Sequence, residues 1–75
     1  HDCTLGDGVH ISPGAHLAGG VTVGDLSWIG LGANIRQLVK VGDEVIVGAG
    51  AVVVKDIIET CTVAGVPATL LNKNY

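Results

Sequence analysis

The chain has 75 residues and a formal net charge of −3, and its four basic residues are scattered, a balance that argues against a nucleic-acid partner. It is 48% apolar but contains no Phe or Met and only one Trp and one Tyr, which argues against a conventional core of large side chains. No apolar run is long enough to cross a bilayer, and there is no signal-peptide pattern. Val, Ile, Ala and 12 Gly residues instead favour a thin, repetitive β core.

A six-residue repeat runs through most of the chain. Every sixth residue from Leu5 to Val53 is aliphatic, and the residue four places after each is small or aliphatic. Six residues fit a short strand and a corner, with the zeroth and fourth places inward and the first and fifth outward. Gly recurs at the third place, where it supplies the positive φ that a tight corner needs. The frame residues are Leu5, Ile11, Leu17, Val23, Ile29, Ile35, Val41, Val47 and Val53.

Three repeats close one triangular coil of 18 residues, and the frame predicts coils over 5–22, 23–40 and 41–58. Residues 18 apart then stack at about 4.8 Å, and only neighbouring coils touch. The frame breaks near Glu59, and the segment 62–68 is expected to lead away from the coil and cover its end, because open strand edges need a cap. The expected division is a β-helix over 1–58 and a capping tail over 59–75. No similar cap precedes Leu5, so we expect the C-terminal part of a longer chain.

The frame and the closing Ala-Gly-Val-Pro-Ala at 64–68 resemble the left-handed β-helix acyltransferases. The opening His1-Asp2-Cys3, with His10 and the Ala-Gly-Gly at 18–20, resembles the bacterial sugar acetyltransferases, a group that includes UDP-4-amino-sugar N-acetyltransferases and sialic acid O-acetyltransferases. The resemblance covers essentially the whole chain, and it alone supplies the left hand of the helix. It implies an all-β left-handed parallel β-helix, acetyl-CoA as acyl donor, no metal, and a sugar acceptor, expected to be nucleotide-linked. It also implies a homotrimer with the cofactor between subunits.

One corner column is predicted to hold His1, Gly19, Gln37 and Lys55, and the pantetheine arm is expected to run along it. On spacing alone His1 is a solvated terminal residue, but the resemblance makes it the general base, with Asp2 tuning it. Gly19 stands at the second place rather than the third, which favours a role as backbone donor to the thioester oxygen over that of a plain corner glycine. Lys55, about 14 Å from His1, is expected near the cofactor phosphates. The alternative for Asp2 is a solvated turn acid.

The resemblance assigns three further cofactor contacts, His10, Leu31 and Ala49. His10 lies with Trp28 and Ile46 on an outward apolar face, where an oligomer interface is a commoner meaning than a base-stacking site. Leu31 and Ala49 stack on another corner, away from His1, so two subunits are expected to share one ligand. A plain polar surface role stays open for His10.

Other residues are given ordinary structural roles. His16 is taken as surface, and Cys3, at an inward place, and Cys61 as reduced thiols of a cytoplasmic protein, because they lack metal spacing. The stacked Asp7, Asp25 and Asp43 suggest either a cation site or turn chemistry, and Asp before Gly favours the turn.

Two alternative classes are weighed against the acetyltransferase. The first is a β-helix without catalysis: a scaffold, a trimerisation module or an ice binder. Ice binding needs flat ladders of outward Thr, whereas Thr22 stands alone among the outward places. The second is a zinc enzyme like the β-helical carbonic anhydrases. His1, His10 and His16 fall at three different coil positions, which argues against the zinc site.

Overall fold

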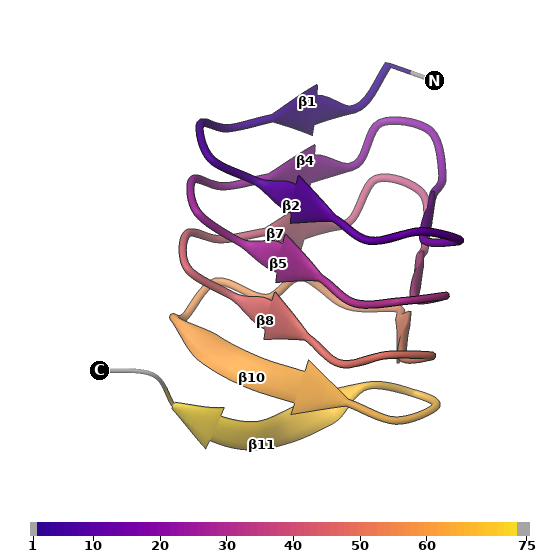
Figure 1. Cartoon of the computed structure of the whole chain (residues 1–75), viewed down its shortest axis with the longest axis vertical. Helices are drawn as coiled ribbons and strands as arrows, with labels where there is room; N and C mark the ends of the chain where they lie inside the picture. The colour runs from indigo at the N-terminus through magenta and orange to yellow at the C-terminus, as the bar shows by residue number, and fades with distance from the viewer. Residues whose placement is uncertain (1, 74–75) are drawn as a thin grey trace.

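The computed structural model describes residues 2–73 of the chain, all of them in strands, corners and turns (Figure 1). Within this range no helix has the length and apolar character needed to cross a membrane. The strands of the repeats are β1 (Thr4–Leu5), β2 (His10–Ile11), β3 (His16–Leu17), β4 (Thr22–Val23), β5 (Trp28–Ile29), β6 (Asn34–Ile35), β7 (Lys40–Val41), β8 (Ile46–Val47) and β9 (Val52–Val53). Two longer strands follow, β10 (Cys61–Ala64) and β11 (Thr69–Lys73).

Three sheets form the sides of a triangular coil, and all their strands run parallel except β11. Sheet A has the order β1-β4-β7, sheet B runs β2-β5-β8-β10-β11, and sheet C has the order β3-β6-β9. Residues 18 apart are in register between successive coils, as in the pairs Thr4–Thr22 and His10–Trp28. The chain is a left-handed parallel β-helix, and the register of 18 confirms the predicted coil length.

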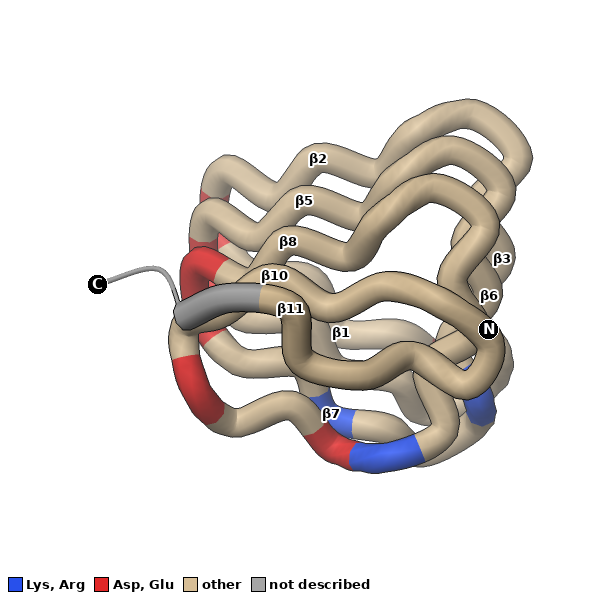
Figure 2. The backbone as a smooth tube through the Cα atoms, turned by 90° about the horizontal axis from the view of Figure 1, so that it is seen from below, with Lys and Arg blue, Asp and Glu red and all other residues tan. Residues whose placement is uncertain are grey.

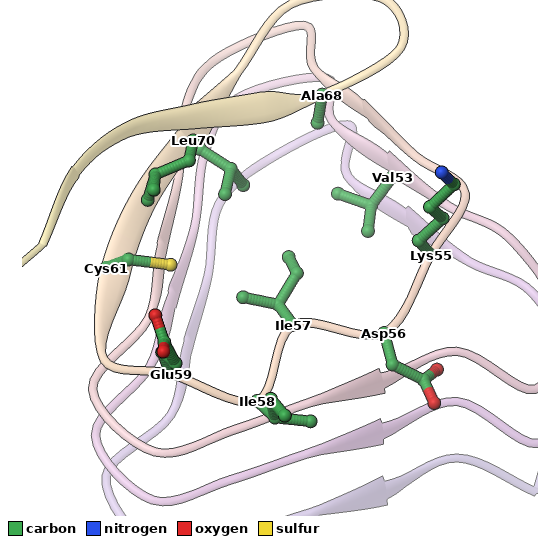
Figure 3. Close-up of a pocket in the computed structure, with 10 residues that line it drawn as sticks. Val53, Lys55, Asp56, Ile57, Ile58, Glu59, Cys61, Ala68 and Leu70 are labelled. Atoms are coloured by element: carbon green, nitrogen blue, oxygen red, sulfur yellow. The ribbon is translucent and has the colours of Figure 1, made fainter.

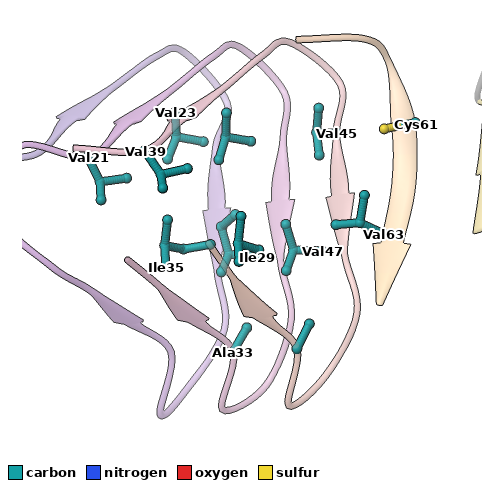
Figure 4. Close-up of a cluster of buried hydrophobic side chains, with 13 residues drawn as sticks. Val21, Val23, Ile29, Ala33, Ile35, Val39, Val45, Val47, Cys61 and Val63 are labelled. Atoms are coloured by element: carbon teal, nitrogen blue, oxygen red, sulfur yellow. The ribbon is translucent and has the colours of Figure 1, made fainter. Parts of the chain in front are cut away.

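The inward places of the repeats form one continuous core along the helix axis (Figure 4). Burial of each Val or Ile side chain contributes about 1.5–3 kcal/mol relative to exposure. In the first coil Leu5 is 48% exposed, whereas Val23 directly below it is 1% exposed. Cys3 packs against the core, as predicted from its inward place. The buried apolar residues are Val21, Val23, Ile29, Ala33, Ile35, Val39, Val41, Val45, Val47, Ala51, Val53, Cys61 and Val63.

The corners of successive coils stack into three columns, called the first, second and third corner. The first corner comprises 19–20, 37–38 and 55–56, the second 7–8, 25–26 and 43–44, and the third 13–14, 31–32 and 49–50. Gly takes positive φ at the third place of five corners, as predicted, but Leu26 (62°), Leu38 (64°) and Glu44 (53°) adopt the same conformation. Leu26 packs below Gly8, where an added Cβ would lie 2.6 Å from its Cδ2. The corner geometry therefore imposes the left-handed backbone even on residues for which it is costly.

The repeat frame shifts by two residues at 55–56, the lowest member of the first corner. Ile57 bridges to Val41 and Thr62 pairs with Ile46, both at a spacing of 16 rather than 18. An unbroken frame would turn the Glu59 carboxylate into the core, and burying an unpaired charge costs several kcal/mol. The shorter corner places apolar side chains inside instead, namely Ile57, Cys61 and Val63.

The expectation that the segment 62–68 leads away from the coil is wrong for its first residues. β10 continues sheet B as a parallel rung below β8, and β11 then folds back antiparallel to β10 (Figure 1). The turn between them covers the edge of β9, since the Val52 N–H donates to the Gly65 carbonyl at 3.0 Å and the Ala68 N–H donates to the Val52 carbonyl at 2.8 Å. The predicted cap is present, and it works by satisfying strand edges.

A hollow of about 400 Å³ remains at this end of the helix (Figure 3). Its walls are inward-facing aliphatic side chains such as Val53 and Ile57, together with Leu70 of β11, and charged groups of Lys55, Asp56 and Glu59 stand at its rim. The hollow is thus the end of the core, which the tail borders without filling.

Candidate functional site

The first corner presents a backbone donor at Gly19. Its carbonyl accepts a hydrogen bond from the Leu38 N–H at 3.0 Å, and the positive φ of this corner belongs to Gly20 (74°), not to Gly19. Backbone conformation therefore does not require glycine at position 19. Within residues 2–73 no acceptor faces the Gly19 N–H, and the residue is half-buried rather than enclosed. This N–H can reach a ligand lying along the corner.

The predicted partner of the base, Asp2, lies one coil above the first corner at Gly19 and Gly20. His1 is outside the described residues, so its contacts with Asp2 stay a prediction. Asp2 is exposed and has φ 54°, close to the values of Gly20 and Leu38, which stand one and two coils below it. Asp2 thus occupies the third place of a corner. The predicted contact of Asp2 with the adjacent base requires such a corner, because adjacent side chains on a strand point in opposite directions.

The backbone positions of Arg36, Lys40 and Lys55 lie beside the first corner, whereas most acidic residues lie toward the second corner (Figure 2). Arg36 precedes the corner, Lys40 follows it, and Lys55 lies in the coil below. Because the repeat frame shifts there, Lys55 stands in a bend shorter than the corners above it, so it is not an equal member of the predicted column. Asp56 offsets part of the charge, and its carboxylate accepts a hydrogen bond from the Lys40 backbone N–H at 2.9 Å.

An open groove of about 450 Å³ runs along the outer face of sheet C, next to the first corner. His16, Asn34 and Val52 stack along it at 18-residue intervals, and the exposed Arg36 lies at its border. The sequence reasoning missed this groove, because it took His16 as surface and did not single out Arg36. The signal was available in the sequence, since the period of 18 places His16 directly above Asn34 and Ala18 directly above Arg36.

The outer face of sheet B carries an aromatic pair. The rings of His10 and Trp28 are stacked, with centroids 4.1 Å apart and an angle of 23° between their planes. Ile46 continues the ladder one rung below, and Trp28 and Ile46 remain 50% and 44% exposed. The predicted apolar face is therefore present, with the His10 ring resting on it.

The third corner carries the other two predicted contacts. Leu31 and Ala49 are both exposed there, and Leu31 is 58% exposed. A Cβ added at Gly32 or Gly50 would meet nothing within 4 Å, so the corner is sterically open.

Within one chain the structure does not bring all the predicted residues together. Gly19 and Lys55 share the first corner, Leu31 and Ala49 share the third, and His10 lies on sheet B, the side of the triangle opposite the first corner. These three parts therefore lie on different sides of the triangular coil.

The aspartate ladder on the second corner serves the backbone. The Asp25 carboxylate accepts a hydrogen bond from the Asp7 N–H at 2.8 Å, and the Asp43 carboxylate accepts one from the Asp25 N–H at 2.7 Å. Gly6 and Gly24 make room, because a Cβ at either would collide with the carboxylate of the coil below. These contacts support the turn interpretation. Among residues 2–73 no three His, Cys, Asp or Glu side chains cluster as a metal site.

No family model matches the chain, and no curated protein does. Solved structures match it closely. The acetyltransferase domain of PglB from Neisseria gonorrhoeae, also determined in complex with acetyl coenzyme A, is 56% identical over 95% of this chain and 35% of its own length, with a TM-score of 0.93. PerB from Caulobacter crescentus, in complex with CoA and GDP-perosamine, is 44% identical over 96% of this chain and 35% of its own, with a TM-score of 0.93.

A more distant match is a maltose O-acetyltransferase from Clostridium difficile, 28% identical over 97% of this chain and 49% of its own, with a TM-score of 0.92. The chain therefore spans between about a third and a half of the length of these relatives. Its solved structural neighbours are hexapeptide-repeat sugar acetyltransferases, as the sequence resemblance predicts.

Proposed function

We propose that this chain, which resembles the hexapeptide-repeat sugar acetyltransferases in fold and sequence, transfers the acetyl group of acetyl-CoA to an amino or hydroxyl group of a nucleotide-linked sugar. The observation that carries the proposal is the 56% identity, over 95% of the chain, to an acetyltransferase domain that has been determined with acetyl coenzyme A. GDP-perosamine in the Caulobacter structure supports a sugar nucleotide as acceptor.

The reaction is a direct attack on the thioester. The acceptor nitrogen or oxygen bonds to the carbonyl carbon while His1 takes its proton, and collapse of the tetrahedral intermediate breaks the C–S bond and releases CoA. Asp2 stabilises the imidazolium that forms. A histidine role is supported by the Caulobacter perosamine N-acetyltransferase, which has been determined with one histidine changed to Asn or Ala. Neither cysteine is suited to carry the acetyl group, because Cys61 is buried and the Cys3 thiol is inward, 3.3 Å from the Ala18 carbonyl.

The cofactor lies along the first corner and the groove on sheet C. The Gly19 N–H donates to the thioester oxygen, where negative charge develops in the transition state. CoA phosphates then extend toward the basic residues beside the corner, with Arg36 at the groove and Lys55 about two strand spacings below Gly19. Arg36 is exposed at the border of the groove, so its guanidinium can bind phosphate in a forked contact.

A homotrimer completes the site. His10, Leu31 and Ala49 are the remaining cofactor contacts, and they come from a neighbouring subunit because sheet B and the third corner face away from the first corner. The exposed Trp28 and the apolar residues beside it on sheet B provide the surface for this association.

Two assays test the proposal in the protein that contains this chain. Calorimetric titration with acetyl-CoA measures donor binding, and incubation with acetyl-CoA and GDP-perosamine measures transfer by thiol release and by the mass of the acetylated product. UDP-linked amino sugars extend the acceptor series, and desulfo-CoA, which lacks the thioester, is the control. Absence of both acetyl-CoA binding and thiol release with every acceptor would overturn the proposal.

The ice-binding alternative gains little from the structure. Thr22 is not isolated, because Thr4 stacks directly on it in sheet A, which corrects the sequence interpretation. The next residue in the ladder is Lys40, however, and its long charged side chain ends the flat threonine surface that ice binding needs. The zinc alternative has no cluster of ligands among the residues described.

A further inference from the structure

The His10–Trp28 stack fixes a side chain that would otherwise rotate freely. His10 is exposed on the two-residue strand β2, and an exposed imidazole turns about χ1 and χ2 on a fast timescale. Trp28 lies directly below it on β5, in register, with the ring centroids 4.1 Å apart. Ile46 supports the indole from the next rung. The imidazole therefore has one face covered by Trp28.

The nitrogen atoms of this imidazole are available to a ligand. Within residues 2–73 no hydrogen bond is made by either nitrogen of His10, so the stack orients the ring without occupying its polar edge. The ring planes differ by only 23°, a stacked arrangement rather than an edge-to-face one. Both nitrogens thus lie at the ring edge, outside the stacked faces, where a neighbouring group can bind them.

We propose that Trp28 is a positioning residue of the cofactor site, which holds the His10 imidazole in the orientation that contacts acetyl-CoA. This inference rests on the proposed function, because it takes His10 as a cofactor contact. Trp28 acts through His10 and not on the cofactor. Its exposed apolar area also makes it a candidate for subunit contact, and the experiment separates the two roles.

The variants Trp28→Leu and Trp28→Phe distinguish the effect of ring stacking from that of apolar surface area. Leucine keeps an apolar side chain on sheet B but removes the aromatic face, and phenylalanine restores a smaller face. We expect Trp28→Leu to weaken acetyl-CoA binding by about 3- to 10-fold, the range that loss of an aromatic pair gives. Trp28→Phe is expected to bind within about 2-fold of the wild type, and sedimentation is expected to show the same oligomer for all three proteins.

A double-mutant cycle with His10→Ala distinguishes a role of Trp28 that acts through His10 from a general structural role. If Trp28 acts through His10, Trp28→Leu has no further effect on acetyl-CoA affinity in the His10→Ala background. The stack itself is measured by NMR, where the indole ring current is expected to shift the His10 ring protons upfield in the wild type and not in Trp28→Leu.

Each contrary result has one meaning. Unchanged affinity in Trp28→Leu, an equal loss with and without His10, or an absent ring-current shift would each overturn the positioning role while leaving the proposed function intact. A wild-type protein that fails to bind acetyl-CoA would overturn the proposed function, and the positioning role with it.

Discussion

Replacing Ser27 with alanine removes a hydroxyl that joins two coils. The Ser27 side chain is 1% exposed, and its Oγ donates to the Gly42 carbonyl at 2.7 Å and accepts from the Val45 N–H at 3.0 Å. In other corners the equivalent amide donates directly to the carbonyl three residues earlier, as Ala33 does to Gly30 at 3.2 Å. The hydroxyl therefore lies between the Gly42 carbonyl and the Val45 N–H in a corner of the coil below, and it bridges these two groups.

The structure sets the size of the effect. Alanine occupies the same inward place at positions 15, 33 and 51, so the substitution introduces no clash. Two hydrogen bonds are lost, each with a net value of about 1 kcal/mol, and direct closure of the Val45 N–H on the Gly42 carbonyl would restore one. We expect the free energy of unfolding to fall by about 1–2 kcal/mol.

Urea and thermal unfolding followed by circular dichroism measure this change. A loss of 1 kcal/mol corresponds to about 4–8 °C in Tm for a domain of this size. Thr22→Ala is the matched control, because it removes an exposed hydroxyl and is expected to stay within about 0.5 kcal/mol of the wild type. A Ser27→Ala protein as stable as this control would refute the reasoning, since the bridge would then add nothing to the direct bond.

Three predictions concern the proposed site. His1→Ala should lower turnover by about 10²–10⁴-fold with little change in acetyl-CoA affinity, and near-normal turnover would exclude His1 as the base. Gly19→Val should block acetyl-CoA binding, measured by calorimetry, because the valine side chain fills the corner. Arg36→Gln should weaken binding by only about 1 kcal/mol or less, because the contact is exposed. Equal binding by wild type and Gly19→Val would rule out this path for the pantetheine arm. The wild-type chain should sediment as a trimer through the face bearing Trp28 and Ile46, and a monomer at micromolar concentration would contradict the shared site.

The repeat frame determined the coil without any tertiary information. Nine aliphatic residues at a spacing of six predict inward places, and the observed register of 18 follows because each coil contacts only its neighbours. The candidate residues Gly19, Leu31 and Ala49 could be assigned to corners for the same reason. Their chemical roles came from the family resemblance, because spacing alone does not distinguish a donor from an ordinary corner residue.

The last corner could not be predicted from the frame, because two requirements conflict there. A constant spacing would keep the corner geometry but turn Glu59 inward, and the chain instead shortens the corner so that Ile57 fills the core. The competition is decided by the cost of burying a carboxylate, which depends on what surrounds position 59 in space.

The side-chain arrangement of the site was decided only in three dimensions. The spacing of 18 places His10 above Trp28, but whether the rings stack depends on rotamers that the sequence does not specify. The groove on sheet C likewise arises from side chains on three strands that are distant in sequence. The sequence by itself determined which residues stack, since a strict period fixes register; the tertiary structure decided what those residues can bind, since ring orientation and groove shape depend on packing between coils.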